Sequence, residues 1–332
     1  MSSRKLSKQQ QSRIDANQKN KLATNSDTDG FSESYNNCNG RVISHFGQQL
    51  EVETLNDDAA TLVRCHQRAN LPALVTGDYV VWEQEDAATG VITAVAQRRN
   101  IFHRPGFGGK LKAVAANIDI VLVVVATAPQ AFMNLIDRYL VAISALNLDS
   151  MLVLNKTDLL DSSNKEALDN LLAVYENLNY SVARVSAKQG DGVANLVAQI
   201  AGKTAVLVGQ SGVGKSSLIN QLGGEVLADT GELSTAHEKG THTTTTARLF
   251  HLEGFDLIDS PGIREFDLGH IEPERIVDGF PELKALSAQC KFRDCRHDSE
   301  PGCAVRAGVQ SGDIARERME SYQQIVRSIT ES

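Results

Sequence analysis

Hydrophobic and polar residues follow two different patterns along the chain, and the change between them falls near residue 104. Between residues 40 and 95, short runs alternate apolar and polar side chains, and turn sequences such as Thr76-Gly77-Asp78 separate them. Strict alternation is typical of strands with one buried face. Five such runs in about 60 residues predict a small β-barrel, with an OB-fold as the leading candidate. The runs cover residues 41–44, 49–53, 60–65, 78–83 and 90–95.

Beyond residue 104, apolar runs alternate with amphipathic segments. Residues 120–126 are all apolar, which predicts a buried parallel strand. Residues 130–147 carry apolar side chains at helical spacing, as expected for a helix that covers a sheet. Further strands are predicted at 151–154, 181–185, 204–208 and 255–258, and further helices at 164–178 and 191–200. This alternation predicts a doubly wound α/β domain.

These patterns suggest four segments with different character. Residues 1–21 carry six Lys/Arg and one Asp, so this stretch is +5 while the whole chain is −8. Such a tail is either an arm for phosphate-rich partners or a solvated disordered end. From residue 273 the chain is predicted to be helical, with a polar helix over 311–330. The expected segments are a basic disordered tail at 1–35, the OB-fold at 36–103, the α/β domain at 104–270 and a C-terminal domain at 271–332.

Composition favours a soluble cytoplasmic protein. Apolar residues make up 42% and charged residues 22% of the chain, which is ordinary for a globular protein. No apolar secretory segment is visible near the start, and the run at 120–126 is far below the ~20 residues that a membrane span needs. We therefore expect a reducing compartment, no disulfides and no membrane partner.

A phosphate-binding loop follows the predicted strand at 204–208. Residues 209–216 match the pattern G-x-x-x-x-G-K-[ST], and a strand before the loop is the context that this motif requires. The glycines let backbone N–H groups point at a phosphate, Lys215 would reach the β- and γ-phosphates, and the Ser216 hydroxyl would bind Mg²⁺. The expected nucleotide contacts here are Gly209, Gln210, Ser211, Gly212, Val213, Gly214, Lys215, Ser216 and Ser217.

A second loop indicates that the nucleotide is guanine. Residues 155–158 read Asn-Lys-Thr-Asp and follow the strand at 151–154, matching the N-K-x-D motif. The Asp158 carboxylate can accept from guanine N1–H and the 2-amino group, which adenine cannot supply. The alternative is a turn with an aspartate helix cap. Residues 186–188 fit the companion motif, and the predicted contacts are Asn155, Lys156, Thr157, Asp158, Ser186, Ala187 and Lys188.

Two further motifs predict the switch elements of a GTPase. Residues 259–262 fit D-x-x-G, so Asp259 would hold Mg²⁺ and the Gly262 N–H would contact the γ-phosphate. Upstream, residues 240–246 supply a threonine for Mg²⁺, either Thr243 or Thr244.

The residue after D-x-x-G is Ile263, which cannot orient a water as the glutamine of Ras-type enzymes does. We take His242 as the candidate for this catalytic role, with a merely structural histidine as the alternative. On the first interpretation, His242→Ala lowers turnover while GTP affinity stays near wild type.

The order of the motifs is rotated. The guanine motifs precede the phosphate-binding loop, and the switches follow it, whereas an unpermuted GTPase begins with the phosphate-binding loop. Circular permutation is physically easy because domain termini often lie close together. In this chain the permutation places the second switch directly before the C-terminal segment. Nucleotide state could therefore reposition that segment, and unchanged hydrogen exchange across 265–310 between GDP and a GTP analogue would count against this hypothesis.

Cys290, Cys295, His297 and Cys303 form a Cys₃His set that suits one tetrahedral structural Zn²⁺. The alternative is four unlinked side chains in a loop. Cys38 and Cys65 lie apart from the set. Basic residues around it suit RNA phosphates. They are Lys291, Arg293, Arg296, Arg306, Arg316 and Arg318.

Together these motifs resemble the circularly permuted small-ribosomal-subunit biogenesis GTPases of the RsgA (YjeQ) family over roughly residues 40–330. The resemblance implies an OB-fold, a permuted GTPase domain and a C-terminal zinc-binding domain. It also implies late maturation of the small ribosomal subunit, hydrolysis of GTP to GDP and phosphate that the particle stimulates, and contact of the outer domains with ribosomal RNA. The matching segments are GQSGVGKS (209–216), NKTD (155–158), THTTTTARL (241–249), DSPGIREF (259–266) and CKFRDCRHDSEPGC (290–303).

The expected partners are therefore the small ribosomal subunit and its rRNA, with no DNA, and the chain is expected to be monomeric. Two alternatives stay open: a nucleotide-gated RNA-binding module with little turnover, and a permuted GTPase that acts on another RNA particle.

Overall fold

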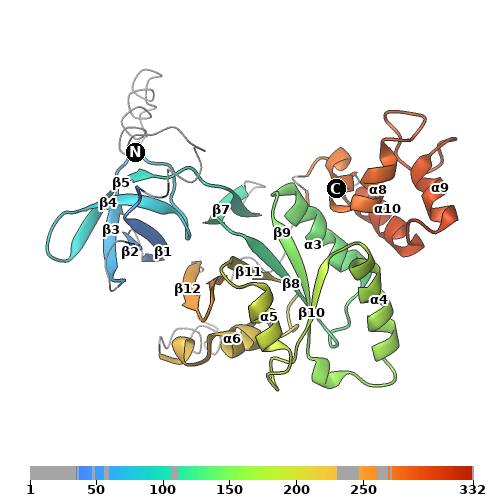
Figure 1. The fold of residues 1–332 in the computed structure, drawn as a ribbon. Coiled ribbons are helices and arrows are strands. Elements are labelled where there is room, and N and C mark those ends of the chain that lie inside the picture. The colour runs from blue at the N-terminus through green and yellow to red at the C-terminus, as the bar shows by residue number, and fades with distance from the viewer. Residues whose placement is uncertain are drawn as a thin grey trace.

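The computed structural model describes residues 35, 37–46, 49–55, 60–105, 111–229, 247–259, 268–269 and 271–330. Figure 1 shows a β-barrel, an α/β domain and a helical C-terminal module in chain order. Within the described ranges, no helix is both long and apolar enough to cross a bilayer.

Five strands form the barrel, as predicted. β1 pairs with both β2 and β4, and β3 runs parallel to β5, so the sheet closes in the order 1-2-3-5-4-1 of an OB-fold. The Trp82 indole packs directly against the backbone of Gly90. A Cβ at Gly90 would lie 2.6 Å from the indole, so glycine is needed for this close approach. The strands are β1 (Gly40–Phe46), β2 (Gln49–Thr54), β3 (Leu62–Gln67), β4 (Tyr79–Gln84) and β5 (Thr89–Val95).

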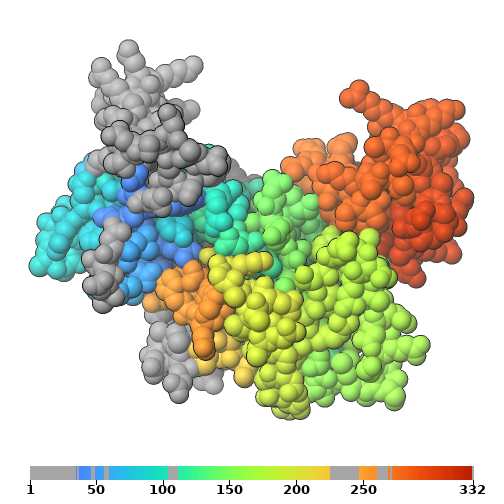
Figure 2. All heavy atoms as spheres, viewed as in Figure 1, coloured from blue at the N-terminus to red at the C-terminus, as the bar shows by residue number. Residues whose placement is uncertain are grey.

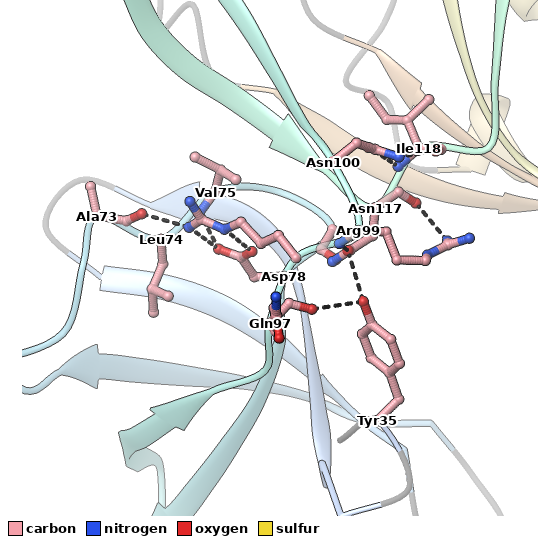
Figure 3. Close-up of polar contacts among 12 residues, drawn as sticks. Tyr35, Ala73, Leu74, Val75, Asp78, Gln97, Arg99, Asn100, Asn117 and Ile118 are labelled. Atoms are coloured by element: carbon pink, nitrogen blue, oxygen red, sulfur yellow. Dashed lines mark hydrogen bonds and ion pairs between the residues drawn. The ribbon is translucent and has the colours of Figure 1, made fainter. Parts of the chain in front are cut away.

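A hairpin that the sequence pattern did not predict connects the barrel to the α/β domain. It consists of β6 (Ile101–Pro105) and β7 (Leu111–Ala116). Directly after it, Asn117 is 1% exposed and has a left-handed backbone (φ 60°), which asparagine tolerates better than most residues. Its Oδ1 accepts from the Tyr35 hydroxyl (3.2 Å) and the Arg99 N–H (3.0 Å), and its Nδ2 donates to the Gly77 carbonyl at 2.9 Å (Figure 3). One buried side chain therefore ties the barrel to the start of the α/β domain.

The described part of the α/β domain has six strands in the order β10-β9-β8-β11-β13-β12, and among these only β12 is antiparallel to its neighbour. If β11, β12 and β13 are counted as strands 1 to 3 and β8, β9 and β10 as strands 4 to 6, this order becomes 6-5-4-1-3-2. That is the strand order of a Ras-type domain whose chain begins at a different strand. One apolar layer packs α3 and α4 on the sheet and another packs α5 and α6 on the opposite face, so the predicted doubly wound fold is confirmed. The strands are β8 (Ile120–Ala126), β9 (Asp149–Asn155), β10 (Ser181–Arg184), β11 (Thr204–Val208), β12 (Arg248–Leu252) and β13 (Phe255–Asp259). The helices are α3 (Met133–Ala145), α4 (Lys165–Asn177), α5 (Val193–Gln199) and α6 (Lys215–Asp229), with a 3₁₀ turn η2 at Thr157–Leu159.

The barrel is also joined to the far edge of the α/β sheet. β1 pairs with β12, which makes one continuous eleven-stranded sheet. Arg41 of β1 lies 2.5 Å from Asp256 of β13, and the Thr76 hydroxyl donates to the Ala247 carbonyl at 2.8 Å. In Figure 2 the orange surface of β12 lies between the blue surface of the barrel and the yellow surface of α5 and α6. The barrel thus contacts the strands that flank the predicted switch segments.

The C-terminal module shares a hydrophobic core with α3. Val141 and Ala142 of α3 lie in the same cluster as Phe280 and Leu283 of the module. A Cβ at Gly279 would lie 2.6 Å from the Val141 Cα, so glycine is required for this close approach. The elements are η3 (Pro273–Gly279), α8 (Pro281–Ser287), α9 (Ala304–Ser311) and α10 (Arg316–Thr330).

The structure corrects two predictions for the module: the residue at which its last helix begins and the surroundings of one arginine. The helix expected over 311–330 begins only at Arg316, because Gly312 takes a left-handed conformation (φ 87°) and ends α9. Arg318 is not a surface cation for RNA. It is 0% exposed, forms ion pairs with Asp137 of α3 and Glu282 of α8, and stacks on Phe280 at 4.3 Å.

Candidate functional site

The loop between β11 and α6 has the backbone shape that a phosphate requires. Gly212 and Gly214 both have positive φ (83° and 90°), which only glycine adopts without strain. A Cβ at Gly214 would lie 2.5 Å from the Asn155 side chain. The Lys215 ammonium curls back onto the loop and donates to the carbonyls of Gly209 and Gln210 at 2.5 and 2.8 Å. The loop thus holds a cation beside a turn of backbone N–H groups.

Asn155, at the end of β9, joins three loops. It is 1% exposed; its Nδ2 donates to the Val213 carbonyl at 3.0 Å, and its Oδ1 accepts from the Ala187 N–H at 3.0 Å. The neighbouring Lys156 has a left-handed backbone (φ 62°), and its ammonium donates to the Ala128 and Gly212 carbonyls at 2.6 and 2.7 Å. Residues 155–158 and 186–188 are therefore fixed against the phosphate-binding loop.

Asp158 has one carboxylate oxygen held in place and one left over. The Ser186 hydroxyl, which is 0% exposed, donates to Asp158 Oδ1 at 2.7 Å. Among the residues that the structure describes, Asp158 Oδ2 has no partner. The Ser186 hydroxyl in turn accepts from the Gln189 N–H at 3.2 Å. This arrangement presents an oriented carboxylate that can accept from a base.

These loops border a cavity of about 430 Å³. Lys156, Lys215, Ser216 and Asp259 line it together with the glycines of the phosphate-binding loop, so the structure brings the ends of β9, β11 and β13 to one place. His242, Thr243, Thr244 and Gly262 lie outside the described residues. A larger hollow of about 590 Å³ lies at the other end of β9 and β10, but no phosphate-binding residue lines it.

Two contributors to the guanine loop have no signal in the sequence. The Thr127 hydroxyl, at the end of β8, donates to the Lys156 carbonyl at 3.0 Å and supports its left-handed backbone. The Ala128 carbonyl receives the Lys156 ammonium. Both act through contacts between segments distant in sequence, which no motif reports.

The Cys₃His residues gather into one cluster in the module. Their sulfur and nitrogen atoms all lie within 4.8 Å of one another. His297 Nδ1 is 3.6 Å from Cys290 Sγ and 3.4 Å from Cys303 Sγ, and the two sulfurs are 3.9 Å apart. Tetrahedral Zn²⁺ bonds place ligand atoms roughly 3.5–3.8 Å apart, so the spacing suits zinc. Burial lowers the pKa of His297, which favours the neutral imidazole that a metal ligand must have. The four residues could hold one zinc ion.

A phosphate-binding loop on β11, an N-K-x-D loop on β9 and a rotated strand order define a circularly permuted GTPase domain. Here that domain lies between an OB-fold and a helical Cys/His module. The family model of the RsgA GTPase matches residues 95–269. Two relatives are named small ribosomal subunit biogenesis GTPase RsgA, one in Pseudomonas syringae pv. tomato and one in Pseudomonas fluorescens SBW25. Both are 52% identical to this chain, over 87% of it and 85% of the first relative, and over 88% of it and 86% of the second.

Two solved structures match most of the chain. YjeQ from Thermotoga maritima matches with a TM-score of 0.73 and 30% identity, over 88% of this chain and 98% of that one. YloQ, described as a circularly permuted GTPase, matches with a TM-score of 0.73 and 26% identity, over 88% and 94%. The chain belongs to the RsgA GTPase family, and its enzymatic activity is GTP hydrolysis.

Proposed function

We propose that this chain binds the small ribosomal subunit and hydrolyses GTP to GDP and phosphate during late maturation of the subunit, with hydrolysis stimulated by the particle. The observation that carries the proposal is the 52% identity over 87% of the chain to relatives named for small-subunit biogenesis. A match of that length extends into the barrel, the GTPase domain and the module.

The residues that line the cavity support separate roles in binding the phosphates, the guanine base and Mg²⁺. Backbone N–H groups of residues 209–217 and the Lys215 ammonium hold the phosphates. Asp158, oriented by Ser186, accepts from guanine and excludes adenine, because adenine would leave the carboxylate unpaired. Mg²⁺ supplies charge neutralisation at the phosphates, and Ser216, Asp259 and Thr243 or Thr244 would hold it. His242 remains the candidate for orienting the attacking water.

The outer parts supply the binding surfaces in this proposal. The OB-fold and the C-terminal module contact rRNA, and the zinc ion at Cys290, Cys295, His297 and Cys303 holds the module's loop in shape. Zinc has no redox chemistry, and a closed set of four protein ligands is typical of a structural site. The protein acts as a cytoplasmic monomer.

GTP turnover measured with purified small subunits, large subunits or neither tests the proposal. We expect turnover to rise with small subunits alone. Stimulation by large subunits alone would show that the chain acts on another particle. Binding of small subunits without any rise in turnover would favour a nucleotide-gated RNA-binding module. Lys215→Ala serves as the control. It removes the ammonium that binds the phosphates and so abolishes turnover by this chain, and any turnover that remains comes from another source.

A further inference from the structure

The loop between Cys290 and Cys295 presents an exposed aromatic side chain. Phe292 is 41% exposed, and in the described part of the chain only one other phenylalanine, Phe132, is exposed. Covering an exposed aromatic ring with a partner removes apolar surface from water and is favourable. Phe132 lies between Ala131 and Met133 at the start of α3, whereas Phe292 lies between Lys291 and Arg293. The two rings therefore have different chemical surroundings.

The cations around Phe292 form no ion pair within the described chain. Lys291, Arg293, Arg296 and Arg306 are without an ion pair there, unlike Arg316, which pairs with Glu320 at 3.1 Å. The Lys291 ammonium lies 5.6 Å from the centroid of the Phe292 ring, within cation–π range.

The acids of the loop cancel these charges only in part. The Glu300 carboxylate accepts from the backbone N–H groups of Arg296 (2.8 Å), Asp298 (2.9 Å) and Ser299 (3.1 Å). These hydrogen bonds, that from Arg296 first, lower its pKa to about 2. Asp294 and Asp298 are the remaining acids, so residues 291–306 carry four cations and three acids in a chain whose total charge is −8.

The loop is also held in one shape. The Lys291 N–H donates to the Gly302 carbonyl at 3.1 Å, and Gly302 has a left-handed backbone (φ 75°) that brings it against the Lys291 side chain. Cys290 and Cys295, at its two ends, belong to the Cys₃His cluster. A loop held this way gives up little backbone entropy when a partner covers the ring, which favours binding.

We propose that Phe292 stacks on an unpaired RNA base while Lys291 and Arg293 contact the phosphates on either side of it. This inference rests on the proposed function, since it specifies how the module meets rRNA. An aromatic ring between cations fits a base with its flanking phosphates, and in duplex RNA the faces of the bases are already stacked. The segment recognised is therefore a loop, bulge or end of the RNA.

The test uses the full-length, zinc-loaded chain and purified small ribosomal subunits. Phe292→Leu keeps apolar bulk but removes the aromatic face, Phe292→Tyr keeps the face, and Phe132→Leu removes the other exposed ring. The readout is the subunit concentration that gives half-maximal stimulation of GTP turnover, with turnover in the absence of subunits as the check on folding. We expect Phe292→Leu to raise that concentration roughly 5- to 150-fold, the equivalent of ~1–3 kcal/mol for one stacked base. Phe292→Tyr and Phe132→Leu should stay near wild type.

The outcomes separate the inference from the proposed function. If small subunits do not stimulate the wild-type chain, the proposed function fails. If they stimulate it and Phe292→Leu behaves as wild type, or Phe292→Tyr is as impaired as Phe292→Leu, only the stacking proposal fails. A photoreactive phenylalanine analogue at position 292 identifies the partner directly. A cross-link to an unpaired nucleotide supports the proposal, and a cross-link to a ribosomal protein overturns it.

Discussion

Replacing Arg318 with methionine tests how the C-terminal module is attached to the GTPase domain. Arg318 is enclosed between α10, α8 and α3, and its side chain and that of Asp137 are both 0% exposed. Its guanidinium also forms two hydrogen bonds with Glu282, at 2.7 and 3.1 Å. Burial opposes the charge, but the hydrogen bonds to Glu282 and the charge of Asp137 raise the pKa of Arg318, so the group stays cationic. Methionine fills a similar volume without charge.

The expected loss follows from the groups left behind. Removing one partner of a buried ion pair costs about 3–5 kcal/mol, because the other charge stays buried without compensation. Asp137 keeps a hydrogen bond from the Tyr175 hydroxyl to its Oδ1 at 2.7 Å, but Oδ2 has no hydrogen-bond partner and the positive charge beside the carboxylate is lost. Stacking on Phe280 is lost as well, while the apolar methionine recovers part of the deficit. We expect a net destabilisation of the module of about 3–5 kcal/mol.

The loss of module stability in Arg318→Met should depend on pH. Burial raises the pKa of Asp137, and the charge of Arg318 opposes that rise. Without Arg318 the folded-state pKa rises further above the unfolded value of about 3.9, so folding favours the protonated carboxyl. Stability from such a group is present at low pH and is lost as pH rises through the folded pKa. The stability gap between Arg318→Met and wild type should therefore narrow as pH falls toward the unfolded pKa of about 3.9.

Native-state hydrogen exchange of α10 is the suitable assay, because the single tryptophan, Trp82, lies in the barrel and does not report on the module. Protection of α10 amides should fall by about two to four powers of ten. The control is Arg316→Met on the same helix, where the side chain is 81% exposed and the expected loss is below about 1 kcal/mol. Equal loss of protection in the two variants would refute the reasoning. So would a double variant with Asp137→Asn that recovers none of the stability.

Three further predictions concern other parts of the molecule. Purified protein should contain one zinc ion per chain by metal analysis, and Cys303→Ser should lower that content and the protection of residues 290–303, while Cys65→Ser in the barrel should leave the zinc content unchanged. Hydrogen bonds that the His251 imidazole donates to the carboxylates of Asp256 and then Glu53 raise the pKa of His251 to about 9. The stability that His251 adds to the contact between β12 and the barrel is therefore complete below about pH 6.5 and is lost as pH rises through about 9. Hydrogen exchange of β12 should show this loss in wild type, and an unchanged pH profile in His251→Gln would contradict it. Ser186→Ala should weaken GDP binding roughly 10- to 100-fold by calorimetry, because Asp158 loses a charge-assisted hydrogen bond; equal GDP affinity in the variant would show that Ser186 does not orient the carboxylate.

Local patterns were sufficient for much of the fold. The alternation between residues 40 and 95 predicted the five strands of the barrel because each strand has one face toward a small core, as in β2, where half-buried and buried residues alternate. The order of the nucleotide motifs predicted the permuted sheet, because each motif follows a particular strand of the GTPase fold. The Cys₃His spacing likewise predicted a cluster that the structure brings together.

Contacts between distant segments could not be predicted in this way. Arg318 has the sequence context of a surface cation on a polar helix, and only the approach of Asp137, 181 positions earlier, makes it a buried one. Pairing of β1 with β12 and the role of Thr127 depend on tertiary approach in the same manner. Neither hydrophobic period nor motif spacing contains that information.

The buried ion pairs of Arg318 also limit how far the C-terminal module can move relative to α3. The hypothesis that nucleotide state repositions the C-terminal segment rested on chain order, since residues 259–262 lead directly into the module. The structure adds that the module is bound along α3, from Asn134, which donates to the Ser321 carbonyl at 3.3 Å, to Ser144, which donates to the Asp278 carbonyl at 2.9 Å. Coupling between two sites is typically worth about 1–3 kcal/mol, less than the about 3–5 kcal/mol needed to break the Arg318 ion pair. Nucleotide exchange alone should therefore leave the module on α3, with equal protection of α3 and α10 amides in GDP and GTP-analogue states. Lower protection of both helices in either state would show that the nucleotide does detach the module.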